Sequence, residues 1–266
     1  LDLTADMLRD KNMRVDEAKF DELMSEQKSR AKANWKGSGD KAKAQGDFAI
    51  LLERFGKNEF VGYEKLSCES KILAILDGNF NIKDEVKSGE IAWLMLERTP
   101  FYGASGGQCA DIGTIGKSTV LDTQKFFDLN LSQISAAQPL KAGDTVECRV
   151  DAPRRTMIAR HHSATHLLHA ALRKILGEHV TQAGSLVEPN RLRFDFSHPK
   201  AMSEDEILAV QSFVNEAICR GAAQKMEIMD IESAKDSGAI ALFGEKYGAD
   251  VRVVSFGKVS KELCGG

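Results

Sequence analysis

The chain has 266 residues, which suits one or two domains, and its 36 Lys and Arg against 39 Asp and Glu give a net charge of −3. That balance excludes a uniformly basic nucleic-acid-binding protein, and 42% hydrophobic with 28% charged residues excludes a disordered or fibrous one. The longest apolar runs, residues 91–96 and 167–172 (the second broken by His169), are far shorter than the ~20 residues of a bilayer span, and no secretion signal opens the chain. We therefore expect a cytoplasmic protein with no membrane partner.

The cysteines indicate reduced thiols. The five are scattered along the chain and never spaced as CxxC, which argues against a disulfide framework and against a self-contained thiolate zinc finger. The chain begins with Leu1 instead of Met and ends on Cys264, Gly265 and Gly266. We therefore expect it to be part of a longer protein.

The first segment is expected to be helical. Apolar residues recur at helical spacing in residues 15–36, with Asp16 placed as the N-cap. Residues 37–41 concentrate glycine and charge, which predicts a link before a short helix at residues 48–55. We assign residues 1–56 to this first part.

The pattern changes between residues 59 and 150. Short apolar or alternating runs, such as residues 71–76, 91–96 and 145–150, are separated by Asp-Gly, Ser-Gly and Gly-Asp turn signals. Short strands joined by such turns are typical of a small β-barrel or sandwich. We assign this part to residues 57–151.

Two helices are predicted after the barrel. The first has Pro153 in its opening turn after Asp151 and ends at Gly177, a natural stop. The second begins at Ser203, with Glu206 three residues later completing a capping box, and runs to about residue 220.

Strands accompany these helices in the last part, residues 152–266. Apolar residues alternate at residues 192–196 and 251–255, which predicts strands. The expected fold class is therefore α+β: an N-terminal helix, a small β-barrel, then helices packed on a mainly antiparallel sheet.

Four of the six histidines lie within nine positions of the first predicted helix. His162 and His166 are i,i+4 neighbours, the spacing at which two imidazoles reach one metal ion. An HxxxH pair alone is more often a polar helix face. Cys264, followed by two glycines, is placed to present a thiolate in a tight turn, although a free cysteine is usually a small buried residue.

A loop at residues 98–108 combines a proline, two aromatics and three glycines. Gly106 and Gly107 would let backbone N–H groups approach a phosphate or sugar closely, and Phe101 and Tyr102 would stack on a base. A hairpin turn with packed aromatics explains the loop equally well.

A local basic cluster accompanies the histidine helix in an otherwise slightly acidic chain. Its members are Arg154, Arg155, Arg160, Arg173 and Lys174. Such a patch beside a candidate metal site suggests a polyanionic substrate, whereas solvated helix surface is the safer interpretation of any single arginine.

Several motifs, in this order, resemble the editing domain of the alanyl-tRNA synthetases. They are HSATHLLHAALR at residues 162–173, GSLV at 184–187, LRFDF at 192–196, ALFGEKY at 241–247 and ELCGG at 262–266. TPFY at residues 99–102 and SGGQ at 105–108 resemble the glycine-rich motif of the same family, and residues 15–30 resemble the helix that leaves its tRNA-recognition domain.

The resemblance implies a β-barrel followed by an editing module that hydrolyses the ester of tRNA(Ala) mischarged with serine or glycine. It implies zinc ligands at His162, His166 and Cys264, with a fourth ligand two positions beyond Gly266. Three ligands bind zinc more weakly than four, so the motifs alone leave zinc occupancy of this chain unsettled.

The remaining site residues follow partly from the resemblance. Thr165 and Gln182 match pocket positions suited to recognising the serine hydroxyl, and we take them as catalytic candidates. The expected tRNA contacts combine the loop aromatics and glycines with two basic residues: Phe101, Tyr102, Gly106, Gly107, Arg154 and Arg155.

The whole synthetase would attach alanine to tRNA(Ala). We expect its ATP and Mg²⁺ only in an upstream domain, because no motif of this chain resembles a nucleotide site. Two alternatives stay open: a module that binds the acceptor stem without catalysis of its own, and a freestanding trans-editing protein. The helix at residues 15–36 favours the synthetase, and no DNA partner is expected.

Overall fold

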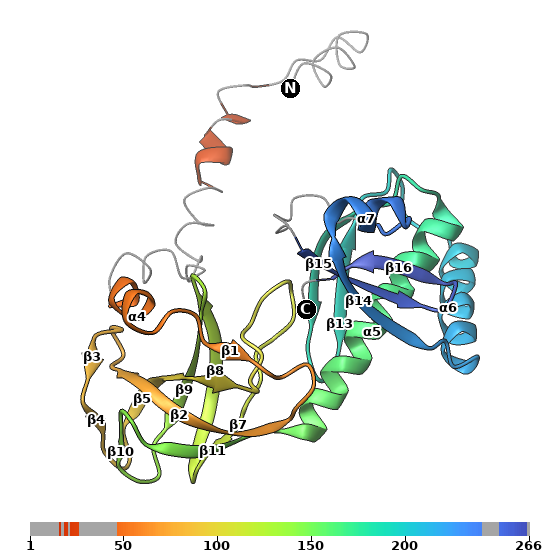
Figure 1. Ribbon diagram of the computed structural model, residues 1–266. Helices are drawn as coiled ribbons and strands as arrows, with labels where there is room; N and C mark the ends of the chain where they lie inside the picture. The colour runs from red at the N-terminus through yellow and green to blue at the C-terminus, as the bar shows by residue number, and fades with distance from the viewer. Residues whose placement is uncertain (1–15, 17–18, 21, 27–46, 241–249, 265–266) are drawn as a thin grey trace. The chain divides into compact units, whose positions relative to one another are not determined.

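The computed structural model describes residues 16, 19–20, 22–26, 47–240 and 250–264 (Figure 1). The chain separates into two units, residues 1–45 and 46–266. In the first unit, residues 19–20 and 22–26 are helical, and the Asp16 carboxylate accepts the Lys19 N–H at 2.9 Å, as its predicted N-cap role requires. The predicted link at residues 37–41 and the ALFGEKY motif lie outside the described residues, as do Gly265 and Gly266.

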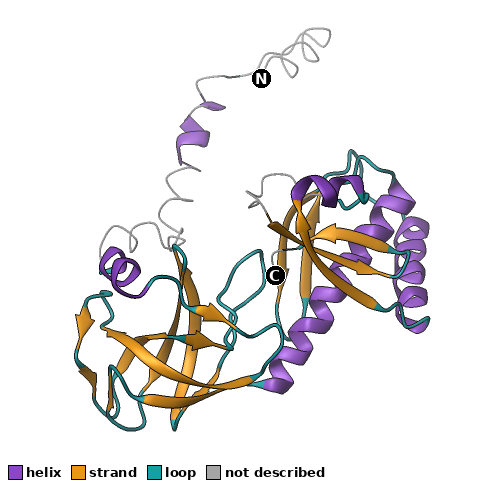
Figure 2. Ribbon diagram, in the orientation of Figure 1, coloured by secondary structure: helices purple, strands orange, loops and turns teal. Residues whose placement is uncertain are grey.

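The second unit opens with a helix and a strand-rich region (Figure 2). Its elements are α4 (Phe48–Phe55), β1 (Glu59–Phe60), β2 (Ser67–Leu76), β3 (Ile82–Lys83), β4 (Glu85–Val86), β5 (Ile91–Leu96), β6 (Arg98–Thr99), β7 (Gly113–Ile115), β8 (Ser118–Phe126), β9 (Leu129–Ser135), β10 (Leu140–Lys141) and β11 (Thr145–Val150). Six of these strands close a barrel in the order β11-β7-β8-β9-β5-β2, because β2 pairs back onto β11. The predicted small β-barrel is therefore confirmed.

Strand β5 is apolar, and it is buried from Ala92 to Leu96 because two cores flank it. Leu94 belongs to the cluster that fills the closed sheet, whereas Trp93 and Met95 pack with Phe48 of α4 on the other face. Burial on both faces replaces the usual polar alternation of an antiparallel strand. Helix α4 thus packs on the barrel, whereas the sequence pattern groups residues up to 56 with the preceding part.

The rest of the chain alternates helices with antiparallel strands. Its elements are α5 (Ala152–Leu176), β12 (Gln182–Val187), β13 (Leu192–Phe196), α6 (Glu204–Cys219), β14 (Gln224–Asp230), α7 (Ile231–Asp236), β15 (Asp250–Phe256) and β16 (Ser260–Leu263). β12 and β13 form a hairpin, and β14, β15 and β16 form a second antiparallel sheet. The predicted α+β class is confirmed. In the described part of the chain, no helix has the length and apolar character needed to cross a membrane.

The long helix α5 carries the histidines, and its ends follow the sequence signals. Asp151 caps it by accepting the Arg154 N–H at 3.0 Å, and Gly177 ends it with a φ of 119° that few other residues adopt. The capping box of α6 is also present, with Ser203 and Glu206 bonding reciprocally.

Candidate metal centre and its pocket

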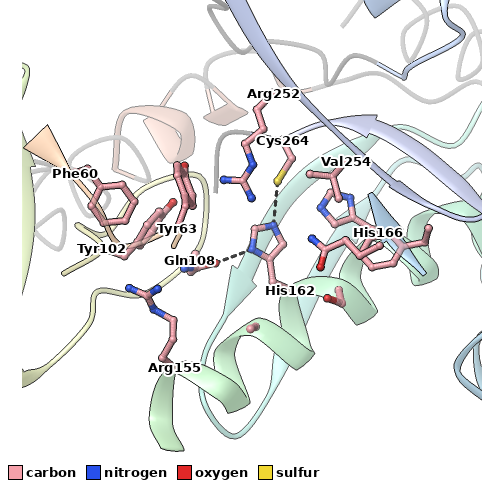
Figure 3. Close-up of a pocket in the computed structure, with 14 residues that line it drawn as sticks. Phe60, Tyr63, Tyr102, Gln108, Arg155, His162, His166, Arg252, Val254 and Cys264 are labelled. Carbon is pink, nitrogen blue, oxygen red and sulfur yellow. Dashed lines mark hydrogen bonds between the residues drawn. The ribbon is translucent and has the colours of Figure 1, made fainter. Parts of the chain in front are cut away.

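Helix α5 and the end of β16 bring three candidate metal ligands together. His162 Nε2 lies 3.2 Å from Cys264 Sγ, and the ligand atoms of His162, His166 and Cys264 all lie within 4.8 Å of one another (Figure 3). Two neutral imidazoles and a thiolate are a donor set typical of zinc. The structure therefore assembles three residues that are 102 positions apart at their extremes.

Hydrogen bonds on the far side of each imidazole fix its orientation. His162 Nδ1–H donates to Gln108 Oε1 at 2.6 Å, and His166 Nδ1–H donates to Glu262 Oε2 at 2.5 Å. The second oxygen of Glu262 accepts the Nδ1–H of His169 at 2.9 Å. Because Nδ1 of each ring bonds to these acceptors, Nε2 is the ring atom directed at the candidate centre, the arrangement that metal-binding histidines commonly use.

The centre passes a test of fit for a metal ion. His166 Nε2 is buried and has no hydrogen-bond partner among the described residues. A buried ring nitrogen without a partner is costly, and a metal ion would satisfy it.

Charges at the centre are coupled. Burial opposes ionisation of the Cys264 thiol, but the His162 hydrogen bond and nearby His166 outweigh burial and lower its pKa to about 5. Burial also disfavours protonated His166, but the neighbouring Cys264 and Glu262 raise its pKa to about 9. The thiolate is the form of cysteine that binds metals.

A pocket of about 130 Å³ opens beside the candidate ligands. His162, His166 and Cys264 line one side, and the rings of Phe60 and Tyr63 line the other (Figure 3). The two rings meet edge to face, 4.9 Å between centroids. The pocket therefore joins a candidate metal centre to an aromatic wall.

The glycine-rich loop positions Gln108 by joining the edge of β12. The Cys109 N–H donates to Val187 O at 3.0 Å, and the Val187 N–H donates to Gly107 O at 2.8 Å. Gly107 has a φ of +81°, and a Cβ there would lie 2.3 Å from Ser185 Oγ. This close backbone approach explains why glycine is needed at Gly107.

The expected tRNA-binding residues of this loop differ in accessibility. Phe101 is fully buried in the barrel core, so it offers no surface to a base, and the alternative of a packed aromatic describes it. Tyr102 is 2% exposed at the pocket wall, where burial raises its pKa to about 12. Gly107 faces Ser185, whereas Gly106 faces open space.

The two arginines at the start of α5 bond to the barrel. Arg155 pairs with buried Asp111 and donates to the carbonyls of Gly62 at 2.7 Å and Pro100 at 3.1 Å. Arg154 donates to another barrel carbonyl at 2.6 Å. Both side chains therefore fix α5 to the barrel in this structure, and neither is a free surface cation.

Thr165 and Gln182, the catalytic candidates, do not line this pocket. The Thr165 hydroxyl donates to His161 O in its own helix at 2.9 Å and is largely buried. Gln182 begins β12 and pairs with Phe196. Their catalytic role remains a prediction.

Three residues of the site were missed from sequence: Gln108 and Arg252, which line the pocket, and Glu262, which accepts the His166 hydrogen bond. Glu262 lies in β16, two positions before Cys264, a spacing that puts side chains of an extended chain on one face, and both side chains contact histidines of α5. Arg252 shares a face of β15 with Val254 and Phe256, which also line the pocket. The contact of Gln108 with His162 joins the barrel to α5 across 54 positions, so no local sequence pattern predicts it.

Comparison with known proteins identifies the family of the chain. The sequence model of the tRNA synthetases class II (A) matches residues 1–154. Alanine-tRNA ligases of Campylobacter jejuni subsp. jejuni serotype O:23/36 (strain 81-176), Sulfurimonas denitrificans and Helicobacter hepaticus are 62%, 58% and 54% identical to the chain. Each alignment covers 100% of the chain and 31% of the relative. The chain thus spans about a third of the length of these curated relatives.

Proposed function

Because the chain belongs to the class II (A) tRNA synthetases, we propose that it is part of an alanine-tRNA ligase whose editing site is the pocket beside His162, His166 and Cys264. The substrate would be tRNA(Ala) carrying serine or glycine in place of alanine, and the reaction would be hydrolysis of the aminoacyl ester. ATP-dependent attachment of alanine, with Mg²⁺, is assigned to the part of the relatives that this chain does not span.

The observation that carries the proposal is the ligand cluster at the wall of a small pocket. His162, His166 and Cys264 would hold zinc, which supplies a Lewis acid that polarises the ester carbonyl. The structure supports this assignment through the two accepting groups, Gln108 Oε1 and Glu262 Oε2, which leave both ligand nitrogens free to coordinate.

The chain's own residues would also orient the substrate. Phe60 and Tyr63 offer an aromatic wall on which the terminal adenine can stack, and the small pocket suits a small aminoacyl group. Discrimination against alanine requires a group that bonds the serine hydroxyl, since an apolar pocket rejects a missing hydroxyl poorly. Thr165 and Gln182 are retained as candidates for that role on resemblance alone.

The test separates the two activities of the full-length ligase. His162→Ala or Cys264→Ala should abolish hydrolysis of Ser-tRNA(Ala) and leave attachment of alanine to tRNA(Ala) intact. Equal loss of both activities would contradict the proposed division. Retained tRNA binding without hydrolysis in the unsubstituted protein would favour a binding module in place of an editing site.

A further inference from the structure

Arg252 projects its guanidinium into the pocket between the aromatic wall and the candidate metal centre (Figure 3). Its Cζ lies 4.0 Å from the centroid of the Tyr63 ring, so the cation stacks on that ring. Its Nε and Nη1 are buried and have no hydrogen-bond partner among the described residues. A cation with two unsatisfied buried donors therefore faces the pocket.

Arg155 lines the same pocket, but it has the hydrogen-bond partners that Arg252 lacks. Arg155 pairs with Asp111 and donates to two backbone carbonyls. Among the described residues, Arg252 Nε and Nη1 have no such partner. Leaving the buried N–H donors of a charged group unpaired is costly. The unpaired donors of Arg252 therefore point to an acceptor that a ligand supplies.

The backbone of Arg252 is firmly placed. It pairs with Ile228 of β14 in the sheet register, and its carbonyl accepts the Cys264 N–H at 2.9 Å. The strand that carries the guanidinium is therefore bonded directly to the residue that supplies the candidate thiolate ligand. A group bound by Arg252 would be held at a fixed position relative to the metal centre.

We propose that Arg252 binds the phosphodiester that precedes the 3′-terminal nucleotide of the tRNA, an assignment that rests on the proposed function. An aminoacyl ester has no free carboxylate and carries a positive ammonium group, so phosphates are the only anions at that end of the substrate. The planar guanidinium matches phosphate oxygens through paired N–H donors. A phosphate contact beside an aromatic wall is the usual composition of a single-strand nucleic-acid site.

The test compares a substrate that has this phosphate with one that lacks it. Arg252→Gln should raise the KM for Ser-tRNA(Ala) roughly ten- to a hundredfold with little change in kcat, and should leave hydrolysis of the seryl ester of adenosine unchanged. Arg252→Lys should recover part of the loss because it keeps the charge. Arg220→Gln, at the exposed end of α6, removes the same charge and should behave like the unsubstituted protein.

Two results would overturn the assignment. Equal loss on both substrates would mean that Arg252 acts at the ester, and no loss on either would mean that it binds neither group. The zinc content of each variant should equal that of the unsubstituted protein, which shows that the centre is intact.

A binding measurement keeps this inference separate from the proposed function. If the unsubstituted protein hydrolyses neither substrate, the editing proposal fails. Titration of the trinucleotide CpCpA still tests Arg252. Arg252→Gln should weaken CpCpA binding and lower the slope of log affinity against log salt concentration by about one, the value for one phosphate contact. The affinity for adenosine should stay unchanged. Unchanged CpCpA affinity would overturn the inference.

Discussion

The Nδ1–H of His162 donates to Gln108 Oε1 at 2.6 Å across 54 positions of sequence. This bond links the helix that carries two candidate metal ligands to the glycine-rich loop of the barrel. The barrel therefore contributes directly to the orientation of the candidate centre and is more than a neighbour of it.

Replacing Gln108 with Ala should weaken zinc binding by roughly ten- to a hundredfold, because His162 loses the acceptor that fixes its ring. Zinc affinity is measured by competition with a chromophoric chelator. Gln124→Ala, on β8, is the control and should leave the affinity unchanged. Identical affinities for all three proteins would show that the bond does not orient the ligand.

Replacing Glu262 with Gln should lower the free energy of unfolding by about 3 kcal/mol. The carboxylate accepts two imidazole N–H groups, one from His166 and one from His169, whereas an amide offers only one oxygen. Urea denaturation provides the measurement. Glu216→Gln removes an exposed carboxylate from α6 and should change stability little; a comparable loss in both variants would contradict the role given to Glu262.

The two neighbouring glycines of the loop should respond differently to alanine. Gly107→Ala places a Cβ 2.3 Å from Ser185 Oγ and should destabilise the protein by more than about 2 kcal/mol and weaken zinc binding through displacement of Gln108. Gly106→Ala meets open space at a φ of +57° and should cost only about 1 kcal/mol. Thermal unfolding and zinc titration of both variants check this order, and the reverse order would refute the packing argument.

Acid should weaken the cap of α6. The Glu206 carboxylate accepts the Ser203 N–H, which holds its pKa below the usual range. A depressed folded-state pKa stabilises the protein above the unfolded pKa, and this contribution disappears as the pH falls through the folded value. When the pH falls from about 6 to about 3, the free energy of unfolding measured by urea titration should therefore decrease less in Glu206→Gln than in the unsubstituted protein. Glu204→Gln, in the same turn, is the control; a pH profile of Glu206→Gln that matches the unsubstituted one would contradict this.

Local signals predicted most elements because each depends on a few adjacent residues. Asp151 and Gly177 bound α5 as expected, and the run at residues 91–96 is strand β5. The HxxxH spacing placed two imidazoles on one face of a helix, the two glycines after Cys264 made it a candidate thiolate, and the resemblance implied all three as ligands. Local geometry is enough for such assignments.

Contacts between distant parts of the fold could not be predicted in this way. Arg155 resembled a free surface cation until the structure placed it against buried Asp111, 44 positions away. Phe101 resembled a stacking platform, yet it belongs to the barrel core. Gln108 and Arg252 acquire their positions from tertiary packing, which no short window of sequence contains.

The central claim is that hydrolysis of Ser-tRNA(Ala) depends on a metal held by His162, His166 and Cys264. The most direct measurement is deacylation of Ser-tRNA(Ala) by the full-length ligase before chelation, after chelation and after zinc is restored. We expect chelation to abolish hydrolysis and zinc to recover it in the unsubstituted protein, with no recovery in His162→Ala. Full hydrolysis by the metal-free protein would contradict the account.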